Sequence, residues 1–426
     1  MTRLPFTRLS LGLVSATALF GMSSAFAATD IGAIVKTYAE IGHAKYEDSL
    51  ITAKALDKAI DTLIANPSED TLKAARDAWI KARVPYQQTE AYRFGNPIVD
   101  DWEGKVNAWP LDEGLIDYVD KSYGTESDEN EQYTLNVIAN PKFTIGGKEI
   151  DATKITPELL SGTLQEAGGS ESNVATGYHA IEFLLWGQDL NGTGPGAGAR
   201  SYTDYDVKNC TNGHCDRRAE YLKAASSLLV SDLDYMVKQW TPEGEAAKAV
   251  LADPKKGIVA MLTGMGSLSY GELAGERMKL GVLLHDPEEE HDCFSDNTYN
   301  SHLNDAVGIA EVYRGAYTRI DGSKVSGPSL SDLVKEKDAA LDTEMKTKLG
   351  HTLDAMHAMA KRGETVEAYD QMIGEGNKDG NAVVQAAIDG LVDQTKSIQR
   401  VISALDLGQI ELEGSDSLDN PNAVFQ

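Results

Sequence analysis

The sequence predicts an all-α protein whose mature chain forms two helical bundles. Apolar residues recur at three- and four-residue steps along most of the chain, and strand patterns are sparse. A glycine-rich loop, NGTGPGAGAR at residues 191–200, divides the helical segments into two halves. Each half contains several long helices joined by irregular segments, which is typical of a pair of helical bundles.

The N-terminus has the pattern of a secretory signal peptide. Arg3 and Arg8 precede an apolar run over residues 9–22. Residues 25–27 are Ala-Phe-Ala, which has the pattern of a small-residue cleavage site. The apolar run is too short to span a membrane, and no later segment has the ~20 uninterrupted apolar residues that a span needs. We therefore expect removal of residues 1–27 and an exported protein in the periplasm, either free or associated with the outer membrane.

Periodicity gives the order of the helices. The predicted helices cover residues 30–63, 72–93, 178–186, 216–240, 244–251, 257–284, 330–359 and 381–405. Before the second of these, Asn66-Pro67-Ser68 supplies a cap, and Glu69 and Asp70 suit the positive first turn. Residues 143–150, FTIGGKEI, predict one small β-hairpin that turns at the Gly-Gly pair.

The irregular segments set the expected domain boundaries. We predict an N-terminal bundle over residues 28–190, a linker over 191–215, a C-terminal bundle over 216–407 and an acidic, disordered tail over 408–426. Roughly 400 mature residues also suggest two domains more readily than one.

Three cysteines are present. Cys210 and Cys215 bracket the short loop CTNGHC, and in an oxidising compartment this spacing predicts a local disulfide. A zinc-binding pair is the weaker alternative. Cys293 is left over, and we expect it to be buried as a small apolar residue.

Charge limits the classes of partner. The formal net charge is −27, and removal of the two arginines of the signal peptide leaves −29. A chain this acidic repels nucleic acid and anionic membrane surfaces, and it concentrates cations around itself. With 42% hydrophobic residues it can still bury a full core. We therefore expect no nucleic-acid partner and weakly favour a metal ion.

The segment GYHAIEFLLWGQDL, residues 177–190, carries the strongest chemical signal. His179 and Glu182 are three residues apart, so they share one face of a helix whose other residues are mostly apolar. Burying such groups without a partner is costly. The pair must therefore contact each other, other charged residues or a metal ion. A satisfied His–Glu hydrogen bond in the core is the alternative.

A second constellation lies on WIKARVPYQQTEAYRF, residues 79–94. Its members fall three and four residues apart and form one helical stripe: Trp79, Arg83, Tyr86 and Glu90. The stripe is too polar for a plain core and too aromatic for a plain surface. A surface salt network over an aromatic patch remains an equal alternative.

Two further segments offer oxygen and imidazole groups. The turn NAWPLDEG presents Asp112, although a loop carboxylate of this kind is usually solvated. Residues 285–305 hold three of the eight histidines and seven acids, a density that suits divalent or trivalent cations. A charged connector is the alternative. Within it, Ser295 and Asp296 belong to a short polar set that resembles a capping turn or a ligand-orienting turn.

Several catalytic motifs are missing from the sequence. It has no H-E-x-x-H helix, no G-x-S-x-G elbow and no P-loop. His179 and Glu182 could supply two zinc ligands of a carboxypeptidase-type site. Such a site needs a further histidine and a general base, and the sequence identifies neither.

Taken together, these segments resemble the imelysin family, which includes the iron-regulated protein A group. Residues 177–190 match its G-x-H-x-x-E signature. Other family hallmarks are KYEDSL (45–50), WIKARVPYQQTEAYRFG (79–95), NAWPLDEGLIDYVD (107–120), GELAGERM (271–278) and HDCFSDNTYN (291–300). The resemblance covers most of the mature chain. It implies two four-helix-bundle domains, a functional site at their interface and a role in bacterial iron uptake.

The resemblance also implies a set of metal ligands. By motif position these are His179, Glu182 and Glu90, with Asp112 as a fourth. One nitrogen and three oxygens fit iron first, with zinc, manganese or copper as alternatives. Around them we expect Arg83, Ser295 and Asp296 to orient the ligands, and Trp79, Tyr86 and Trp109 to shield the site from water. Some relatives carry a second glutamate where this chain has Gln87, which lowers the negative charge of a site here.

We therefore expect an exported metal-binding protein of iron uptake, with a metal ion or iron chelate as its ligand and a membrane transport protein as a further partner. The first alternative is a docking protein that grips an iron chelate or a protein partner. The second is a zinc metallopeptidase of the H-x-x-E type, an activity once assigned to the family. We rank enzymatic activity last.

Overall fold

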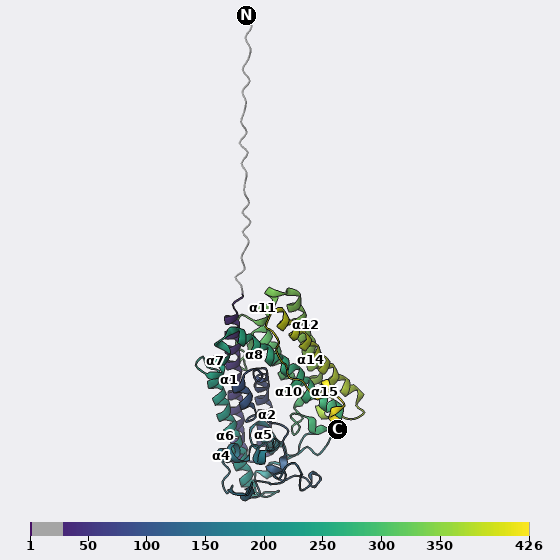
Figure 1. Cartoon of the computed structure of the whole chain (residues 1–426). Coiled ribbons are helices and arrows are strands. Elements are labelled where there is room, and N and C mark those ends of the chain that lie inside the picture. The colour runs from purple at the N-terminus through teal and green to yellow at the C-terminus, as the bar shows by residue number, and fades with distance from the viewer. Residues whose placement is uncertain (2–28, 426) are drawn as a thin grey trace.

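The computed structural model describes Met1 and residues 29–425 (Figure 1). Apart from Met1, the predicted signal peptide, residues 1–27, lies outside the described residues. As predicted, the described chain is mostly helical and carries small antiparallel two-stranded sheets. Among its helices, none is long and apolar enough to cross a membrane.

Four helices form the N-terminal bundle: α1 (Ile31–Ala65), α2 (Glu69–Gln87), α5 (Gly177–Trp186) and α6 (Cys215–Gln239). Each packs against the next in this order, and α6 returns to α1 (Figure 1). The predicted cap starts α2, where Ser68 and Thr71 bond to each other's backbone N–H groups in a reciprocal pair.

The C-terminal bundle contains one composite rod and three helices. The rod comprises α8 (Pro254–Ser267), a π-helical segment η7 (Leu268–Lys279) and α9 (Leu280–Leu284). It packs with α10 (Thr298–Arg314) and α14 (Lys378–Ala404), and α12 (Ala339–Thr365) closes the bundle between these two. The two bundles meet where α10 contacts α2 and the 3₁₀ turn η1 (Glu90–Tyr92).

Shorter elements connect the bundles' helices. They are α3 (Pro97–Glu103), α4 (Pro157–Leu159), α7 (Glu245–Leu251), α11 (Leu330–Lys337), α13 (Tyr369–Ile373) and α15 (Asp416–Asp419). The predicted hairpin is present as β1 (Lys142–Ile145) and β2 (Lys148–Asp151), with Phe143 opposite Ile150. A second hairpin, β3 (Ala316–Thr318) with β4 (Lys324–Ser326), was not predicted because its strands are only three residues long.

The structure places the boundary between the bundles later than the sequence suggests. The predicted C-terminal bundle began at residue 216, but α6 packs along α1. Lys223 Nζ lies 2.8 Å from Asp57 Oδ1, and Ser226 donates to the same oxygen at 2.6 Å. Tyr221 donates to the Ala175 carbonyl just before α5. Because the loop of residues 191–215 leads back to the first bundle, that bundle extends through Gln239.

The tail is ordered, and the expectation of disorder is wrong. Glu413 N donates to Ser267 Oγ at 3.1 Å, and Ser417 donates to the Gly275 carbonyl at 2.9 Å. Glycines of the rod, Gly266 among them, leave room for the tail to approach the helix backbone closely. The acidic composition of the tail does not reveal this packing, because the glycines that accept the tail lie more than 100 positions earlier in the chain.

Two other differences concern helix ends. The predicted helix over residues 72–93 ends at Gln87, and residues 90–92 form η1 instead. The predicted helix over 330–359 is interrupted at Asp338, whose carboxylate caps α12. Helix α10 was not predicted because its buried face includes polar residues such as Ser301, His302 and Asp305. These residues interrupt the helical periodicity of apolar residues in the sequence.

Candidate metal centre

The position of α5 depends on its first residue. Gly177 has φ +79°, and a Cβ at this position would collide with the Val106 carbonyl. Tyr178 N donates to that same carbonyl at 2.7 Å. The glycine of the signature therefore lets α5 start directly against the segment that precedes Asn107.

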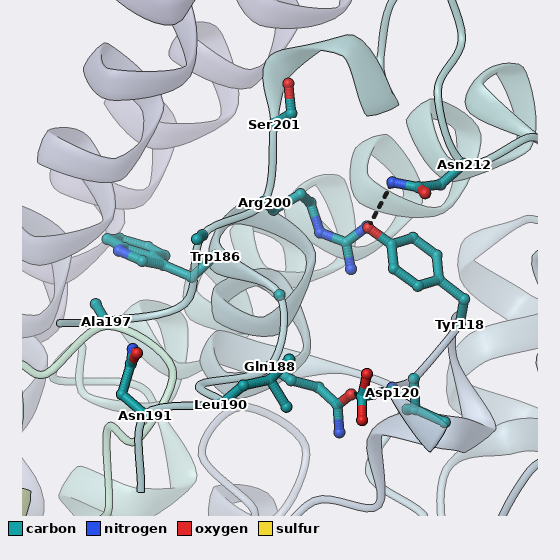
Figure 2. A pocket seen from close by; sticks show the side chains of 13 residues that line it. Tyr118, Asp120, Trp186, Gln188, Leu190, Asn191, Ala197, Arg200, Ser201 and Asn212 are labelled. Carbon is teal, nitrogen blue, oxygen red and sulfur yellow. Dashed lines mark hydrogen bonds between the residues drawn. The ribbon is translucent and has the colours of Figure 1, made fainter. Parts of the chain in front are cut away.

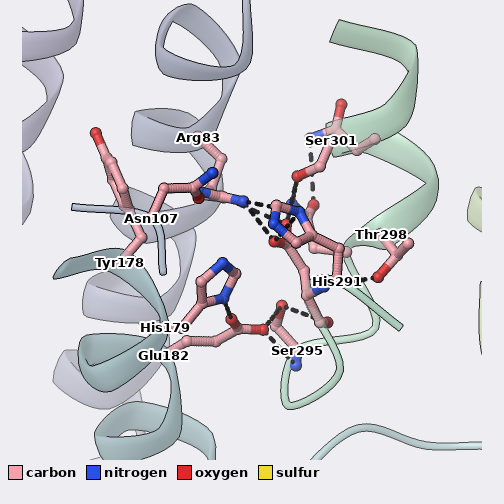
Figure 3. A network of polar contacts seen from close by, with 12 residues as sticks. Arg83, Asn107, Tyr178, His179, Glu182, His291, Ser295, Thr298 and Ser301 are labelled. Carbon is pink, nitrogen blue, oxygen red and sulfur yellow. Dashed lines mark hydrogen bonds and ion pairs between the residues drawn. The ribbon is translucent and has the colours of Figure 1, made fainter. Parts of the chain in front are cut away.

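One turn further on, His179 and Glu182 face each other inside the protein. His179 Nδ1 lies 3.0 Å from Glu182 Oε2, and the two side chains are 1% and 0% exposed. The other carboxylate oxygen, Oε1, accepts from both the backbone N–H (3.0 Å) and the hydroxyl (2.6 Å) of Ser295. Glu182 thus links the signature helix to the segment that leads into α10 (Figure 3).

Arg83 of α2 reaches the same place from the opposite side. Its Nη2 donates to Asp292 Oδ1 at 2.7 Å, and its Nη1 donates to Asn107 Oδ1 at 2.6 Å. The Arg83–Asp292 ion pair is fully buried. The guanidinium carbon also lies 5.0 Å from the ring centre of Tyr178 and 5.5 Å from that of Trp79. These aromatic faces stabilise a buried cation.

Asp292 is the most heavily bonded carboxylate of the site. Its Oδ2 accepts from Asn297 Nδ2 at 2.8 Å and from the Ser301 hydroxyl, while its backbone N–H donates to Thr298 Oγ1 at 2.8 Å. Within the described chain, Oδ1 has Arg83 as its hydrogen-bond donor and keeps a lone pair for another partner. We call the following residues the Arg83 network (Figure 3): Arg83, Asp292, Asn297, Thr298, Ser301, His179, Glu182, His291 and Ser295.

His291 completes the arrangement. Its ring lies 4.8 Å from that of His179 and 5.8 Å from that of Trp109, edge-on in both cases. In the described part of the chain, His179, His291 and Asp292 each offer a ligand atom within 4.8 Å of the other two. His179 Nε2 is buried and has no hydrogen-bond partner there. In the tautomer in which Nδ1 carries the proton and donates it to Glu182, Nε2 of His179 has a free lone pair for this group.

The local electrostatics favour neutral imidazoles and an ionised Asp292. Burial, assisted by the Arg83 guanidinium, lowers the pKa of His179 to about 3. Burial and the Arg277 guanidinium lower the pKa of His291 well below its usual value. Burial opposes ionisation of Asp292, but the Arg83 guanidinium brings its pKa below the usual range. Burial and Asp292 raise the pKa of Glu182 well above its usual value.

A cleft of about 390 Å³ approaches this group from outside. Its lining includes His291, Trp109, Asn107 and charged residues of η7 such as Glu272 and Arg277. His291 is the one member of the candidate ligand group that borders the cleft, and it is itself only 3% exposed. An ion can therefore reach the group from this side only after small movements of its lining.

The predicted ligands are not all brought together. Glu90 lies on η1, where it pairs with Arg277 at 2.8 Å, and Arg277 also pairs with Glu272 and Asp305. Asp112 accepts from Asn130 and from Ser172 in a loop of the N-terminal half. Neither of them belongs to the group formed by His179, His291 and Asp292, and the third predicted carboxylate, Glu182, is not a member either.

The other predicted site residues take up several positions. Arg83 and Ser295 orient Asp292 and Glu182, as described above. Trp79 is buried and donates to the Tyr178 carbonyl at 3.0 Å, while Tyr86 packs on the Tyr178 ring. Trp109 lies at the cleft beside His291. Asp296 belongs to a different group, with Glu290 and Asp370. Gln87 is buried, and its side-chain amide has no partner in the described chain.

Sequence reasoning missed His291, Asp292 and Asn107. The segment HDCFSDNTYN contains the first two, and it was already marked by its density of ligand-type residues. Asp296 was preferred to Asp292 there because nothing local distinguishes two aspartates four positions apart. The distinguishing feature is Arg83, which lies 209 residues earlier.

The predicted disulfide between Cys210 and Cys215 is present, and Cys293 is a half-buried free thiol. Close by, a separate pocket of about 390 Å³ lies at the end of α5 and is lined by residues such as Tyr118, Trp186 and Arg200 (Figure 2). Arg200 pairs there with Asp117 at 2.8 Å and Asp204 at 3.0 Å, which offsets its charge. Among the described residues, neither group of candidate metal ligands lies in this pocket.

Comparison with known proteins bears on the family and on the fold of this chain. The model of the imelysin family matches residues 42–398. Iron-regulated protein A of Synechococcus elongatus is 37% identical over 60 residues, which is 14% of this chain and 17% of that protein. The chain therefore matches less than a fifth of the length of this curated relative.

A solved structure extends the comparison to the whole fold. It is a candidate iron-regulated protein A precursor from Parabacteroides distasonis, with a TM-score of 0.63. The likeness covers 90% of this chain and 97% of that chain at 20% sequence identity. At this identity, the comparison establishes a common fold.

Proposed function

Because this chain belongs to the imelysin family, we propose that it is an exported protein of bacterial iron uptake that binds an iron ion as cargo through His179, His291 and Asp292. The observation that carries the proposal is the buried Nε2 of His179, which has no hydrogen-bond partner among the described residues and lies beside a second imidazole and an ionised carboxylate. Buried polar atoms in native proteins nearly always have a partner, so an orphaned imidazole nitrogen suggests a ligand.

The chemistry of the donor set supports iron. Two imidazole nitrogens and one carboxylate oxygen form the combination that non-haem Fe²⁺ prefers, and they leave coordination positions open. The same set accepts Zn²⁺ or Mn²⁺, so the donor atoms alone do not select iron. The proposal of iron therefore also rests on the names of the similar proteins. Glu182 acts in this scheme through the other ring nitrogen of His179, because a carboxylate on Nδ1 fixes the tautomer and makes Nε2 a better donor.

The proposed ligands revise the set expected from the sequence. His291 and Asp292 replace Glu90 and Asp112, which are occupied by Arg277 and by Asn130 and Ser172. Glu182, also expected as a ligand, contacts His179 Nδ1 and is not a ligand in the revised set. The ligands then come from α5 on one side and from the segment before α10 on the other. Because these segments belong to different bundles, a change in the contact between the bundles would release the ion to a membrane transport partner.

Burial ranks metal binding ahead of the two alternatives. His179 is 1% exposed, so neither a polypeptide nor a bulky chelate could reach its Nε2. Glu182 is held by His179 and Ser295 and is poorly placed to activate water. A chelate would instead have to stay in the outer cleft beside His291 and Trp109.

Isothermal titration tests the proposal. The metal-stripped protein without residues 1–27 is titrated with Fe²⁺ under anaerobic conditions, and with Fe³⁺, Zn²⁺, Mn²⁺ and Cu²⁺. We expect one equivalent of iron, with binding abolished in His179→Ala and in His291→Ala. The matched control is His351→Ala, on the exposed face of α12, which should bind like the wild type. Thermal melting shows that each variant is folded.

The same preparations separate the alternatives. Unchanged iron binding in His179→Ala would contradict the proposal. Zinc-dependent cleavage of an unfolded protein substrate that disappears in His179→Ala would favour the metallopeptidase. Binding of ferric citrate without binding of free iron would favour the docking protein.

A further inference from the structure

A second group of carboxylates lies next to the Arg83 network and has no role in it. Glu290 and Asp296 belong to the segment before α10, and Asp370 belongs to α13. Each offers an oxygen within 4.8 Å of the other two. Glu290 and Asp370 are each 1% exposed, and Asp296 is half-buried. The group therefore lies beneath the surface, between two segments that are about 75 residues apart in the chain.

Several oxygens of these carboxylates have no hydrogen-bond partner among the described residues. Within the described chain, no hydrogen-bond partner exists for Glu290 Oε1, for Asp296 Oδ1 or for either carboxylate oxygen of Asp370. None of the three forms an ion pair with a described lysine, arginine or histidine at 4.0 Å or less. Asp292 shows the contrast, because its oxygens accept from Arg83, Asn297 and Ser301.

The surroundings add negative charge rather than offset it. Burial and the nearby Asp189 carboxylate, with Glu367 as a further contributor, raise the pKa of Asp370 to about 7. An ionised carboxylate that is buried without a partner is costly, so such groups normally pair or coordinate a metal. An oxygen of Asp370 lies within 4.8 Å of an oxygen of Glu290 and of an oxygen of Asp296, so acidic groups converge at this point. A ligand there must be positively charged.

We propose that Glu290, Asp296 and Asp370 form a second metal site, which takes a hard divalent cation of the Ca²⁺ type. The three carboxylates offer up to six oxygens, and Ca²⁺ takes six to eight oxygen ligands. The group contains no imidazole and no thiolate, and this composition discriminates against Zn²⁺ and Cu²⁺. The site is distinct from the His179 centre, because the two groups share no ligand.

The position of the site gives it a structural consequence. Glu290 and Asp296 flank the residues that complete the His179 centre, namely His291, Asp292 and Ser295. A cation held by these two carboxylates and Asp370 would tie that segment to α13. A hydrogen bond already joins a neighbouring residue to the end of α13, because His285 Nδ1 lies 2.6 Å from the Ile373 carbonyl oxygen. An occupied site would therefore hold the segment of the His179 centre in place and raise the stability of the fold.

Terbium luminescence tests this site directly, because Tb³⁺ replaces Ca²⁺ at oxygen sites and emits when nearby tyrosines are excited. The protein without residues 1–27 is stripped of metal and titrated with Tb³⁺ in 0.15 M salt, which screens weak binding to its acidic surface. We expect saturable emission that Ca²⁺ displaces. Saturating Ca²⁺ should also raise the melting temperature by about 5 °C.

The decisive variant is Asp370→Asn, which keeps the shape and removes one charge. We expect it to lower the affinity for Tb³⁺ at least about tenfold and to abolish the Ca²⁺-induced shift in melting temperature. The matched control is Glu375→Gln, an exposed acid five positions later, which should leave both unchanged. His179→Ala should also retain the emission, so failure of the iron proposal would leave this result unaffected.

Three results would overturn the proposal. The first is equal Tb³⁺ affinity in the wild type and Asp370→Asn. The second is loss of emission in His179→Ala, which would assign the ion to the other centre. The third is a metal-free Asp370→Asn protein that melts well below the metal-free wild type. That result would mean that the Asp370 carboxylate stabilises the fold without a cation.

Discussion

Arg83 and Asp292 form a fully buried ion pair, 2.7 Å between Nη2 and Oδ1, that joins α2 of the N-terminal bundle to the segment preceding α10. The pair fixes the position of Asp292 beside His179 and His291. It also balances the charge of the carboxylate, so the group can exist before an ion arrives. The same ion pair therefore contributes both to the contact between the bundles and to the assembly of the candidate metal centre.

Loss of this arginine should destabilise the protein strongly. Removing one partner of a buried ion pair leaves an uncompensated charge and typically costs about 3–5 kcal/mol. We predict a loss of this size for Arg83→Met in the free energy of unfolding, measured by urea denaturation. The double variant Arg83→Met/Asp292→Asn should recover at least about half of it, since no unpaired charge remains. A loss below about 1 kcal/mol for the single variant would show that the pair is not structurally important.

The hydroxyl of Ser295 should tune the affinity for metal. Ser295→Ala removes one of two hydrogen bonds to Glu182 Oε1 and keeps the backbone one. Changes to groups that orient a metal ligand commonly lower affinity about 10–100-fold. We predict about a tenfold loss of iron affinity by titration, with little change in melting temperature. Ser417→Ala removes a buried hydroxyl bonded to the rod and should leave iron affinity unchanged. Equal affinities in all three proteins would contradict the role assigned to Glu182.

Gly177 should be intolerant of any side chain. In Gly177→Ala, a Cβ would meet the Val106 carbonyl at a residue with φ +79°. Gly124 has φ +90° and ψ −170°, with open space where a Cβ would lie, so Gly124→Ala measures the cost of an unfavourable backbone conformation without a collision, about 1–3 kcal/mol. We predict that Gly177→Ala lowers the melting temperature clearly further than Gly124→Ala. Similar shifts for the two variants would mean that the start of α5 can move away from Val106 without penalty.

Glu103 should make stability depend on pH near neutrality. Burial and the nearby Glu90 carboxylate raise its pKa from 4.5 to about 7. Between these values the unfolded chain releases a proton that the folded protein retains, so this group's contribution lowers stability as the pH rises from 4.5 to 7. Above pH 7 the loss is complete.

Glu103→Gln removes that titration. We predict that the variant gains stability relative to the wild type as the pH rises from 4.5 to 7.5, measured as the difference in urea-unfolding free energy at each pH. Glu149→Gln, at an exposed position of β2, serves as the control. A difference between Glu103→Gln and the wild type that stays flat over this range would contradict the buried environment of Glu103.

Local sequence patterns predicted much of the fold. The apolar period located α1, α6 and α14 closely, because each buries one continuous stripe. The cysteine spacing predicted the disulfide, and the signature placed His179 and Glu182 on one face of a helix, with their mutual contact as one of the alternatives. These features depend on residues within a few turns of one another, and local physics determines them.

The remaining features depend on contacts over long distances in the chain. The apolar periodicity of α10 is obscured by polar residues on its buried face, which contact the Arg83 network and Arg277. Glu90 seemed to share the stripe of Arg83, but α2 ends at Gln87 and η1 directs Glu90 to Arg277 instead. The partner of each buried charge decides which carboxylates meet the histidines, and no periodicity reveals that choice.

A crystal structure of the iron-loaded protein, with anomalous data collected on both sides of the iron absorption edge, would locate the bound ion. We expect one strong iron peak within about 2.3 Å of His179 Nε2 and of ligand atoms of His291 and Asp292. A strong iron peak beside Glu90 or Asp112, or a loaded crystal in which His179 Nε2 still has no partner, would contradict it.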